Sequence, residues 1–159
     1  MESFELKGKH PVALEQVSES EIETLLSLAA KMHSSDTYTP LLERSEWEEE
    51  LKSGTVNFIR NGAEIVGCLA YEQKDPSHIY ISELFITPEH QGKGVAREVL
   101  SKFIVEHPEA TRVDLTTHPD NPAVGLYKSL GFEVEERREN YYGDGQPRLV
   151  LVLSKPEKH

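Results

Sequence analysis

The stretch Gln91-Gly92-Lys93-Gly94-Val95-Ala96 is the most informative part of this sequence. It follows a strand-like run over residues 79–86 and precedes a helix-like run. Glycines let a backbone turn tightly and approach a ligand closely, and the first amides of a helix have no intrahelical partner. The stretch therefore predicts a strand, a phosphate-holding loop and a helix in succession, with a pyrophosphate-bearing compound as the ligand.

Two common nucleotide-binding loops do not fit these glycines. A Walker A loop has Ser or Thr after Gly-Lys and a glycine earlier in the loop, but here Gly94 follows Lys93 and position 87 is Thr. A dinucleotide-binding fingerprint has a third glycine where this chain has Arg97. The pattern that remains is Gln-x-x-Gly-x-Ala. Taken alone, this segment could also be an ordinary turn between a strand and a helix.

A second informative segment, residues 121–132, carries the signals of a separate helix. Asn121 can cap a helix, Pro122 suits the first helical position, and Gly131 can end the helix in the left-handed conformation. Tyr127 falls on the apolar stripe of this helix. Alone it would be a core tyrosine, but together with the glycine loop it becomes a candidate catalytic residue.

Together the two segments resemble the GNAT superfamily of N-acetyltransferases. The acyl-CoA signature of that family is Arg or Gln, two residues, Gly, one residue, then Gly or Ala, which Gln91, Gly94 and Ala96 match. Its later element, Asn-x-x-Ala followed by Leu-Tyr and Gly-Phe, is matched by Asn121, Leu126, Tyr127, Gly131 and Phe132. One departure is that Ala follows Asn by two positions rather than three. The resemblance covers residues 55–154 well and the first 54 only in layout.

The resemblance implies acetyl-CoA as the co-substrate and a sheet that splays apart between its fourth and fifth strands to admit the pantetheine arm. Backbone groups of the fourth strand should then face the pantetheine, amides of the glycine loop should hold the pyrophosphate, and the asparagine before the tyrosine helix should bind the cofactor chain. The predicted cofactor-binding residues are Phe85, Ile86, Gln91, Gly92, Lys93, Gly94, Val95, Ala96 and Asn121.

Acetyl transfer to an amine sets chemical requirements that point to particular residues. A protonated amine cannot attack, and even an α-amine with a pKa near 8 is neutral only about one time in ten at pH 7. Glu83, on the predicted strand that reaches the acyl site, is the candidate base, directly or through water; a sheet-edge carboxylate or a substrate anchor are its alternative roles. The Ile86 amide is the candidate oxyanion donor. The resemblance places Tyr127 near the cofactor sulfur, as the general acid.

Candidate acceptor-binding residues come from the least regular segments, residues 34–44 and 140–147, and are Tyr38, Glu43, Tyr141 and Tyr142. The late Tyr-Tyr-x-Asp-Gly stretch is similar to one in the branch that acetylates ribosomal-protein N-termini and related peptide amines. A plain hairpin turn at Asp144-Gly145 is the alternative. We therefore predict a peptide or protein amine as the acceptor. A polyamine or amino sugar, a non-catalytic acyl-CoA sensor and a nucleotide-binding scaffold remain as alternatives.

Charge and composition exclude some classes of function. The net charge of −11, from 28 acidic and 17 basic residues, argues against nucleic acid as a partner. It would suit cationic acceptors, although an ordinary acidic, solvated surface is the preferred explanation. The glutamates at positions 46, 48, 49 and 50 are predicted as the solvated face of a helix that buries Trp47.

The single cysteine, Cys68, excludes an internal disulfide, fits a reducing compartment, and is predicted as a buried thiol rather than a nucleophile. The seven histidines lack ligand spacing, so no metal site is predicted. The chain has no apolar run near eighteen residues and an acidic start, which predict a cytoplasmic protein without a membrane partner. Monomer and homodimer both remain open.

The length of 159 residues suits one α/β domain, in which residues 1–54 hold a strand and two helices and residues 55–154 form the acyl-CoA-binding core. We predict a mixed, mostly antiparallel sheet of about seven strands flanked by about four helices. Ser20 and Glu23 have the spacing of a capping box, and Asn61-Gly62 predicts a hairpin. The expected strands are 11–17, 55–60, 64–72, 79–86, 113–117, 133–139 and 149–154, and the expected helices are 20–32, 45–51, 94–107 and the segment around Tyr127.

Overall fold

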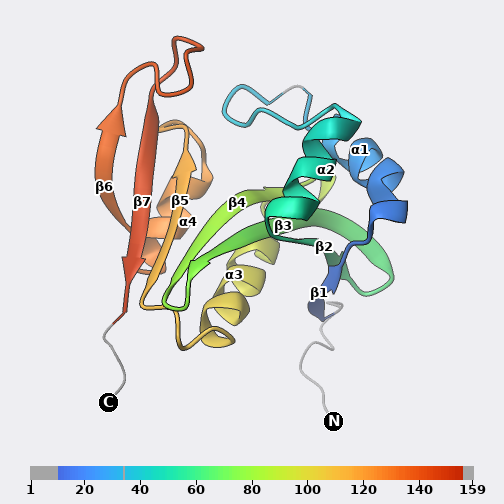
Figure 1. Ribbon diagram of the computed structural model, residues 1–159, viewed down its shortest axis with the longest axis horizontal. Coiled ribbons are helices and arrows are strands. Elements are labelled where there is room, and N and C mark those ends of the chain that lie inside the picture. The colour runs from blue at the N-terminus through green and yellow to red at the C-terminus, as the bar shows by residue number, and fades with distance from the viewer. Residues whose placement is uncertain (1–10, 34, 156–159) are drawn as a thin grey trace.

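A single seven-stranded sheet organises the computed structural model, which describes residues 11–33 and 35–155 (Figure 1). The strand order is β1-β2-β3-β4-β5-β7-β6. All neighbouring strands are antiparallel except β4 and β5, which are parallel, so the prediction of a mixed, mostly antiparallel sheet is confirmed. The strands are β1 (Val12–Gln16), β2 (Thr55–Asn61), β3 (Glu64–Asp75), β4 (His78–Ile86), β5 (Arg112–Thr117), β6 (Glu133–Arg138) and β7 (Arg148–Ser154).

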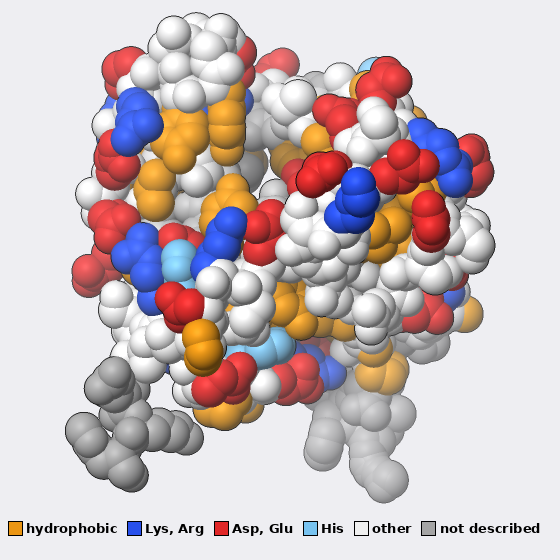
Figure 2. Space-filling view, viewed as in Figure 1, with side chains coloured by type: hydrophobic (Ala, Val, Ile, Leu, Met, Phe, Trp, Pro, Cys, Tyr) orange, Lys and Arg blue, Asp and Glu red, His pale blue; other side chains and the backbone are white. Residues whose placement is uncertain are grey.

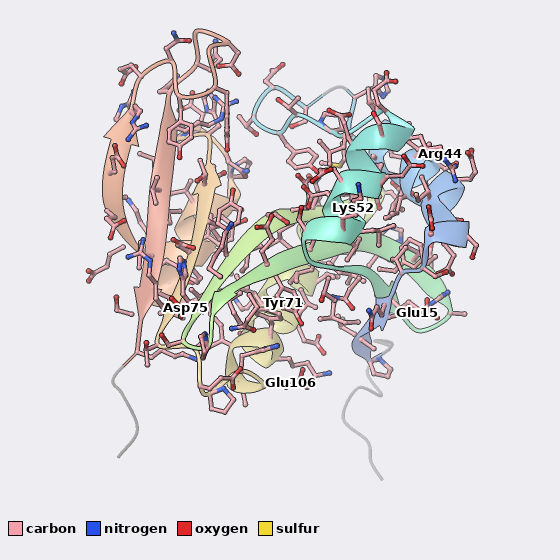
Figure 3. The ribbon with its side chains drawn as sticks, in the orientation of Figure 1. Glu15, Arg44, Lys52, Tyr71, Asp75 and Glu106 are labelled. Atoms are coloured by element: carbon pink, nitrogen blue, oxygen red, sulfur yellow. The ribbon has the colours of Figure 1, made fainter. Side chains whose placement is uncertain are left out.

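Four α-helices cover the sheet, two on each face (Figure 1). They are α1 (Ile22–Ala30), α2 (Arg44–Ser53), α3 (Val95–Val105) and α4 (Ala123–Ser129). Helices α1 and α2 lie on one face, where Trp47 is fully buried and donates a hydrogen bond from Nε1 to the Leu41 carbonyl at 2.9 Å. Helices α3 and α4 cover the other face. There Tyr71 reaches from β3 toward α3 and meets the Phe103 ring with centroids 4.9 Å apart (Figure 3).

The start of the first helical segment differs from the prediction. The capping box is formed by Ser18 and Glu21, because a 3₁₀ turn over Glu19–Glu21 precedes α1 and moves the first turn upstream. Glu21 Oε1 accepts a hydrogen bond from the Ser18 N–H at 2.9 Å. Glu23, which we expected in the box, instead forms an ion pair with Arg44 at 3.1 Å. The sequence pattern predicted a capping box at this helix start but placed it two residues too late.

The parallel joint between β4 and β5 is short, and an ion cluster holds it. Only three residue pairs match the two strands: His78↔Arg112, Ile79↔Val113 and Tyr80↔Asp114. Asp114 lies 2.9 Å from His78 and 3.0 Å from Arg112, which also bonds Glu135 of β6 at 2.9 Å. Beyond these pairs the strands separate (Figure 1). The predicted splay between the fourth and fifth strands is confirmed.

No helix in the described part of the chain is long and apolar enough to cross a membrane. Among residues 11–33 and 35–155, no group of three or more His, Cys, Asp or Glu side chains is arranged to hold a metal ion.

Candidate active site

The opening between β4 and β5 leads into a cavity of about 470 Å³. The predicted cofactor-binding residues line it, with the exception of Lys93. Its wall is made by the segment between α1 and α2, the end of β4, the glycine loop, the first turn of α3, and α4 with the residues before it. The lining residues are Met32, Ser35, Thr37, Tyr38, Leu84, Phe85, Ile86, His90, Gln91, Gly92, Gly94, Val95, Ala96, Arg97, Asn121, Pro122, Ala123, Leu126 and Tyr127.

The glycine loop presents a row of unused amides to this cavity. In the part of the chain that the structure describes, the N–H groups of residues 92–97 donate to no protein acceptor, and the first bond of α3 runs from the Glu98 N–H to the Gly94 carbonyl at 3.0 Å. Gly94 has a φ of +83°, a conformation that strains any residue with a Cβ. Amides at the start of a helix, beside its positive dipole end, form a site for anionic oxygens.

The end of β4 turns backbone groups into the same cavity. The Thr87 N–H donates a hydrogen bond to the Val66 carbonyl at 2.9 Å. Residue pairs of antiparallel strands alternate between hydrogen-bonded and non-hydrogen-bonded pairs. The next pair, Ile86↔Gly67, is therefore non-hydrogen-bonded. The N–H and C=O of Ile86 therefore point away from β3, toward the opening. Gln91 Nε2 donates a hydrogen bond to the Ile86 carbonyl at 2.8 Å, which connects the loop to the strand. The Ile86 N–H faces the cavity.

Helix α4 brings Tyr127 to the opposite wall. Asn121 Oδ1 accepts a hydrogen bond from the Ala123 N–H at 2.9 Å, and its Nδ2 donates to Thr117 Oγ1 at 3.0 Å, so one side chain connects the start of α4 to β5. The N-cap of α4 is Pro122, one residue after the predicted cap. Gly131, with a φ of +106°, ends the helix as predicted. The Tyr127 side chain is 4% exposed and forms no hydrogen bond among the described residues. Burial raises the pKa of Tyr127 to about 12, so the hydroxyl keeps its proton at neutral pH.

A β-bulge in β4 sets the position of Glu83. The register shifts from Tyr71↔Ile81 to Ala70↔Glu83, which leaves Ser82 as the extra residue. Regular alternation would send Ser82 and Glu83 to opposite faces of the sheet. With the bulge, both face α2: the Ser82 hydroxyl donates to Glu50 of that helix at 2.8 Å. Glu83 accepts a hydrogen bond from the Tyr38 hydroxyl, which belongs to the segment between α1 and α2.

Burial dominates the electrostatics of Glu83 and raises the pKa of its carboxyl to about 8, with Glu50 and Glu46 adding to the rise and the Tyr38 hydrogen bond opposing it. A carboxyl with a pKa in this range exchanges protons near neutral pH, as a general base requires.

Glu83 lies on a second cavity of about 420 Å³, on the α2 face of the sheet. Figure 2 shows the molecule hollowed between the part formed by β5–β7 and the part formed by α1 and α2, with acidic side chains on the α2 side. The lining residues are Thr37, Tyr38, Thr39, Leu41, Glu50, Glu72, Tyr80, Ile81, Ser82, Glu83, Leu84, Leu115, Thr116, Thr117, His118, Asn121, Tyr127, Tyr142, Asp144 and Arg148. The two cavities share Thr37, Tyr38, Leu84, Asn121 and Tyr127.

The predicted acceptor-binding residues separate into two groups. Tyr38 and Tyr142 line the second cavity. Glu43 lines neither cavity; it is the N-cap of α2 and its N–H bonds Glu46 at 3.1 Å. Tyr141 also lines neither, and packs against Tyr142 with ring centroids 4.8 Å apart. Only part of each irregular segment therefore reaches the cavity.

Glu50 is a cavity residue that our sequence interpretation placed in solvent. The prediction that all four glutamates of α2 form a solvated face is wrong for Glu50, because α2 packs that side against β4. A signal was present: Glu50 follows the buried Trp47 by three positions, and residues so spaced share a helix face. Tyr80, His118 and Arg148 were also missed, since each belongs to a strand or its end and reaches the cavity only through sheet pairing.

The model of the acetyltransferase (GNAT) family matches residues 20–132, more than half of the chain. The chain belongs to the GNAT family. An uncharacterised N-acetyltransferase of Bacillus subtilis, YsnE, is 32% identical over 114 residues, which cover 67% of this chain and 74% of that protein. The predicted family and enzyme class, N-acetyltransferase, are confirmed.

Solved GNAT structures share the fold at low sequence identity. The ribosomal-protein-S18-alanine N-acetyltransferase of Escherichia coli superposes with a TM-score of 0.79 at 16% identity, covering 94% of this chain and 97% of that one. A GNAT acetyltransferase of Elizabethkingia anophelis with acetyl-CoA bound gives 0.69 at 16% identity, covering 90% and 97%. These likenesses show the fold alone. The prediction of acetyl-CoA as the donor is confirmed at the level of the family.

Proposed function

We propose that this GNAT chain transfers the acetyl group of acetyl-CoA to a primary amine by direct attack in a ternary complex, and that the acceptor is a peptide or protein amine. The observation that carries the proposal is the meeting of two cavities at Tyr127 and Tyr38. One cavity offers amides for a pyrophosphate and the other offers a carboxylate for an ammonium group. A donor and an acceptor could therefore enter separately and meet at the junction.

The donor would lie along the end of β4. The unused amides of residues 92–97 suit the pyrophosphate, and the opening beyond Tyr80↔Asp114 leaves β4 unpaired on that side for the pantetheine arm. The Ile86 N–H, directed into the cavity, is positioned to stabilise the oxyanion that forms when the thioester carbonyl is attacked.

Glu83 would take a proton from the incoming ammonium group. The free carboxyl is largely protonated at pH 7, since its pKa is about 8, and a cationic amine beside it favours the ionised form. The neutral amine then attacks the thioester carbon and the new C–N bond forms. The C–S bond breaks with its electron pair on sulfur, and the second proton of the nitrogen replaces the one that Tyr127 gives to the sulfur.

Tyr127 would give its proton to the departing thiolate. The Tyr127 side chain is 4% exposed, forms no hydrogen bond among the described residues, and lines both cavities. A non-catalytic acyl-CoA sensor has no need of such a donor at the junction, which favours the enzyme.

The choice of a peptide amine rests on the loop between β6 and β7. Tyr142 of this loop lines the acceptor cavity and is 59% exposed, so the cavity is open where a longer chain could leave it. The similarity of the Tyr-Tyr-x-Asp-Gly stretch to the branch that acetylates ribosomal-protein N-termini and related peptide amines supports this order of acceptors. A small amine, such as a polyamine or amino sugar, is the alternative.

The test is release of free CoA from acetyl-CoA across three panels: peptides with free N-termini, polyamines and amino sugars. We expect turnover with peptides at least about tenfold more efficient, in kcat/KM, than with amino sugars, a difference of about 1.4 kcal/mol. Turnover with amino sugars alone would overturn the order of acceptors. Absence of thermal stabilisation by saturating acetyl-CoA would contradict the proposed function itself.

A further inference from the structure

The acceptor cavity carries two acidic side chains, Glu50 and Glu83, that pair with no basic group among the described residues. Glu72 is paired with Lys74 at 2.6 Å, and Asp144 is paired with Arg148 at 2.9 Å. Glu50 and Glu83 have no Lys, Arg or His within ion-pair distance in residues 11–33 and 35–155. The wall of the cavity therefore holds two acidic groups that gain a negative charge when they ionise and have no basic group to pair with.

The remaining basic groups of the wall do not pair with these two glutamates. Arg148 is already bonded to the Asp144 carboxylate and the Pro147 carbonyl. The ring of His118 accepts a hydrogen bond at Nδ1 from the Asp120 N–H at 3.0 Å and has Nε2 3.1 Å from Gln146 Oε1, so both ring nitrogens already have partners other than the two glutamates.

Glu50 is held close to Glu83 without cancelling its charge. The Ser82 hydroxyl donates to Glu50 at 2.8 Å, and Ser82 directly precedes Glu83 on the same face of the bulged strand. Burial raises the pKa of Glu50, with Glu72 and Glu49 adding to the rise. Two neighbouring half-buried carboxylates without cations are costly in free energy, and a bound cation would relieve that cost.

A separate observation indicates that this wall faces a ligand. Tyr127 is 4% exposed, lines the same cavity, and forms no hydrogen bond among the described residues. A buried hydroxyl ordinarily has a partner in the folded protein. For Tyr127 that partner would lie in the cavity. A molecule bound between Tyr127 and the two glutamates would supply it.

We propose that the acceptor carries a second positive charge a short distance from the reacting amine, and that Glu50 binds this second charge while Glu83 faces the first. This inference rests on the proposed function, since it places the acceptor in the second cavity. It makes Glu50 a specificity-determining residue. The same chemistry is offered by an alkyl diamine and by a peptide whose N-terminal residue is followed by a basic one.

The test compares acceptors that differ only in the second charge: butane-1,4-diamine against butylamine, and the peptide pair Ala-Lys-Ala and Ala-Gln-Ala. We expect the dicationic member of at least one pair to be favoured about tenfold in kcat/KM, because a partly desolvated charge pair contributes more than an exposed one. The pair that shows the preference identifies the source of the second charge.

The variant Glu50→Gln should reduce that preference to about twofold or less, with the hydrogen bond to Ser82 still possible. Glu49→Gln is the matched control, since it removes the same charge from an exposed position one residue earlier in α2 and should keep the preference. Equal efficiency for both members of both pairs in the wild type would overturn the proposal and leave the proposed function standing. Absence of turnover with every amine would instead refute the proposed function. A preference that survives in Glu50→Gln would assign the second charge to another residue.

Discussion

The Tyr38 hydroxyl donates a hydrogen bond to the Glu83 carboxylate, although 45 positions separate the two residues in the sequence. Tyr38 also packs against Phe85, the next residue on the same face of β4, with ring centroids 5.4 Å apart. The irregular segment between α1 and α2 is therefore attached to the strand at the point where the two cavities meet. This contact makes Tyr38 a positioning residue for the proposed base.

The variant Tyr38→Phe should shift the acid limb of the kcat/KM profile to higher pH. The Tyr38 hydrogen bond opposes the effect of burial on the Glu83 pKa, so its loss should raise that pKa. Each unit of increase lowers the ionised fraction at pH 7 about tenfold. Tyr141→Phe is the control, since Tyr141 lines neither cavity. A profile with an unmoved acid limb would remove Tyr38 from this role.

The variant Glu83→Gln should change the pH dependence of stability. The folded-state pKa, about 8, lies above the ordinary value of 4.5, so the protonated carboxyl stabilises the fold fully below pH 4.5. That contribution is lost as the pH rises through about 8. Glutamine has no such dependence, so the variant should gain stability relative to wild type from pH 5 to 9. Urea unfolding at pH 5 and pH 9 gives the free energy of unfolding of both proteins. The same difference between variant and wild type at both pH values would refute the shifted pKa.

The variant Tyr127→Phe should lower kcat by at least about tenfold, because a general acid typically contributes a factor of a hundred or more. The ring would keep its packing against Phe132, whose centroid lies 5.9 Å away, so the fold should persist. Acetyl-CoA should bind as in the wild type, which calorimetric titration can check. Near-normal turnover would make Tyr127 a core residue only.

The variant Gly67→Ala should weaken both stability and acetyl-CoA binding. A Cβ at this position would lie 2.2 Å from the Phe85 carbonyl oxygen and would force β4 away from β3. Such overpacking costs about 1–3 kcal/mol and would displace the Ile86 amide. Gly125→Ala is the matched control. A Cβ there meets nothing within 4 Å, and alanine should stabilise α4 by about 0.5–1 kcal/mol. Equal effects of the two substitutions would contradict the steric explanation.

Signals with short spacing were sufficient to predict the loop and the helix that line the first cavity. The loop at residues 91–96 and the helix around Tyr127 depend on glycines, caps and apolar stripes whose effects extend only a few residues. Gly94 and Gly131 adopt the left-handed backbone, and helix α3 begins directly after Gly94. For these elements the sequence by itself determined the local structure, and the same motifs identified the family.

Tertiary structure decided which side chains line the second cavity, where we propose that the acceptor binds. Strict alternation separates Ser82 from Glu83, and only the bulge against β3 places them on one face. The Tyr38 contact and the inward position of Glu50 depend on how α2 and its preceding segment pack on that face. Glu43, from the same irregular region, is the N-cap of α2 and does not line the cavity. Register and packing are set by partners far away in sequence, so no local spacing could predict which of these side chains share the cavity.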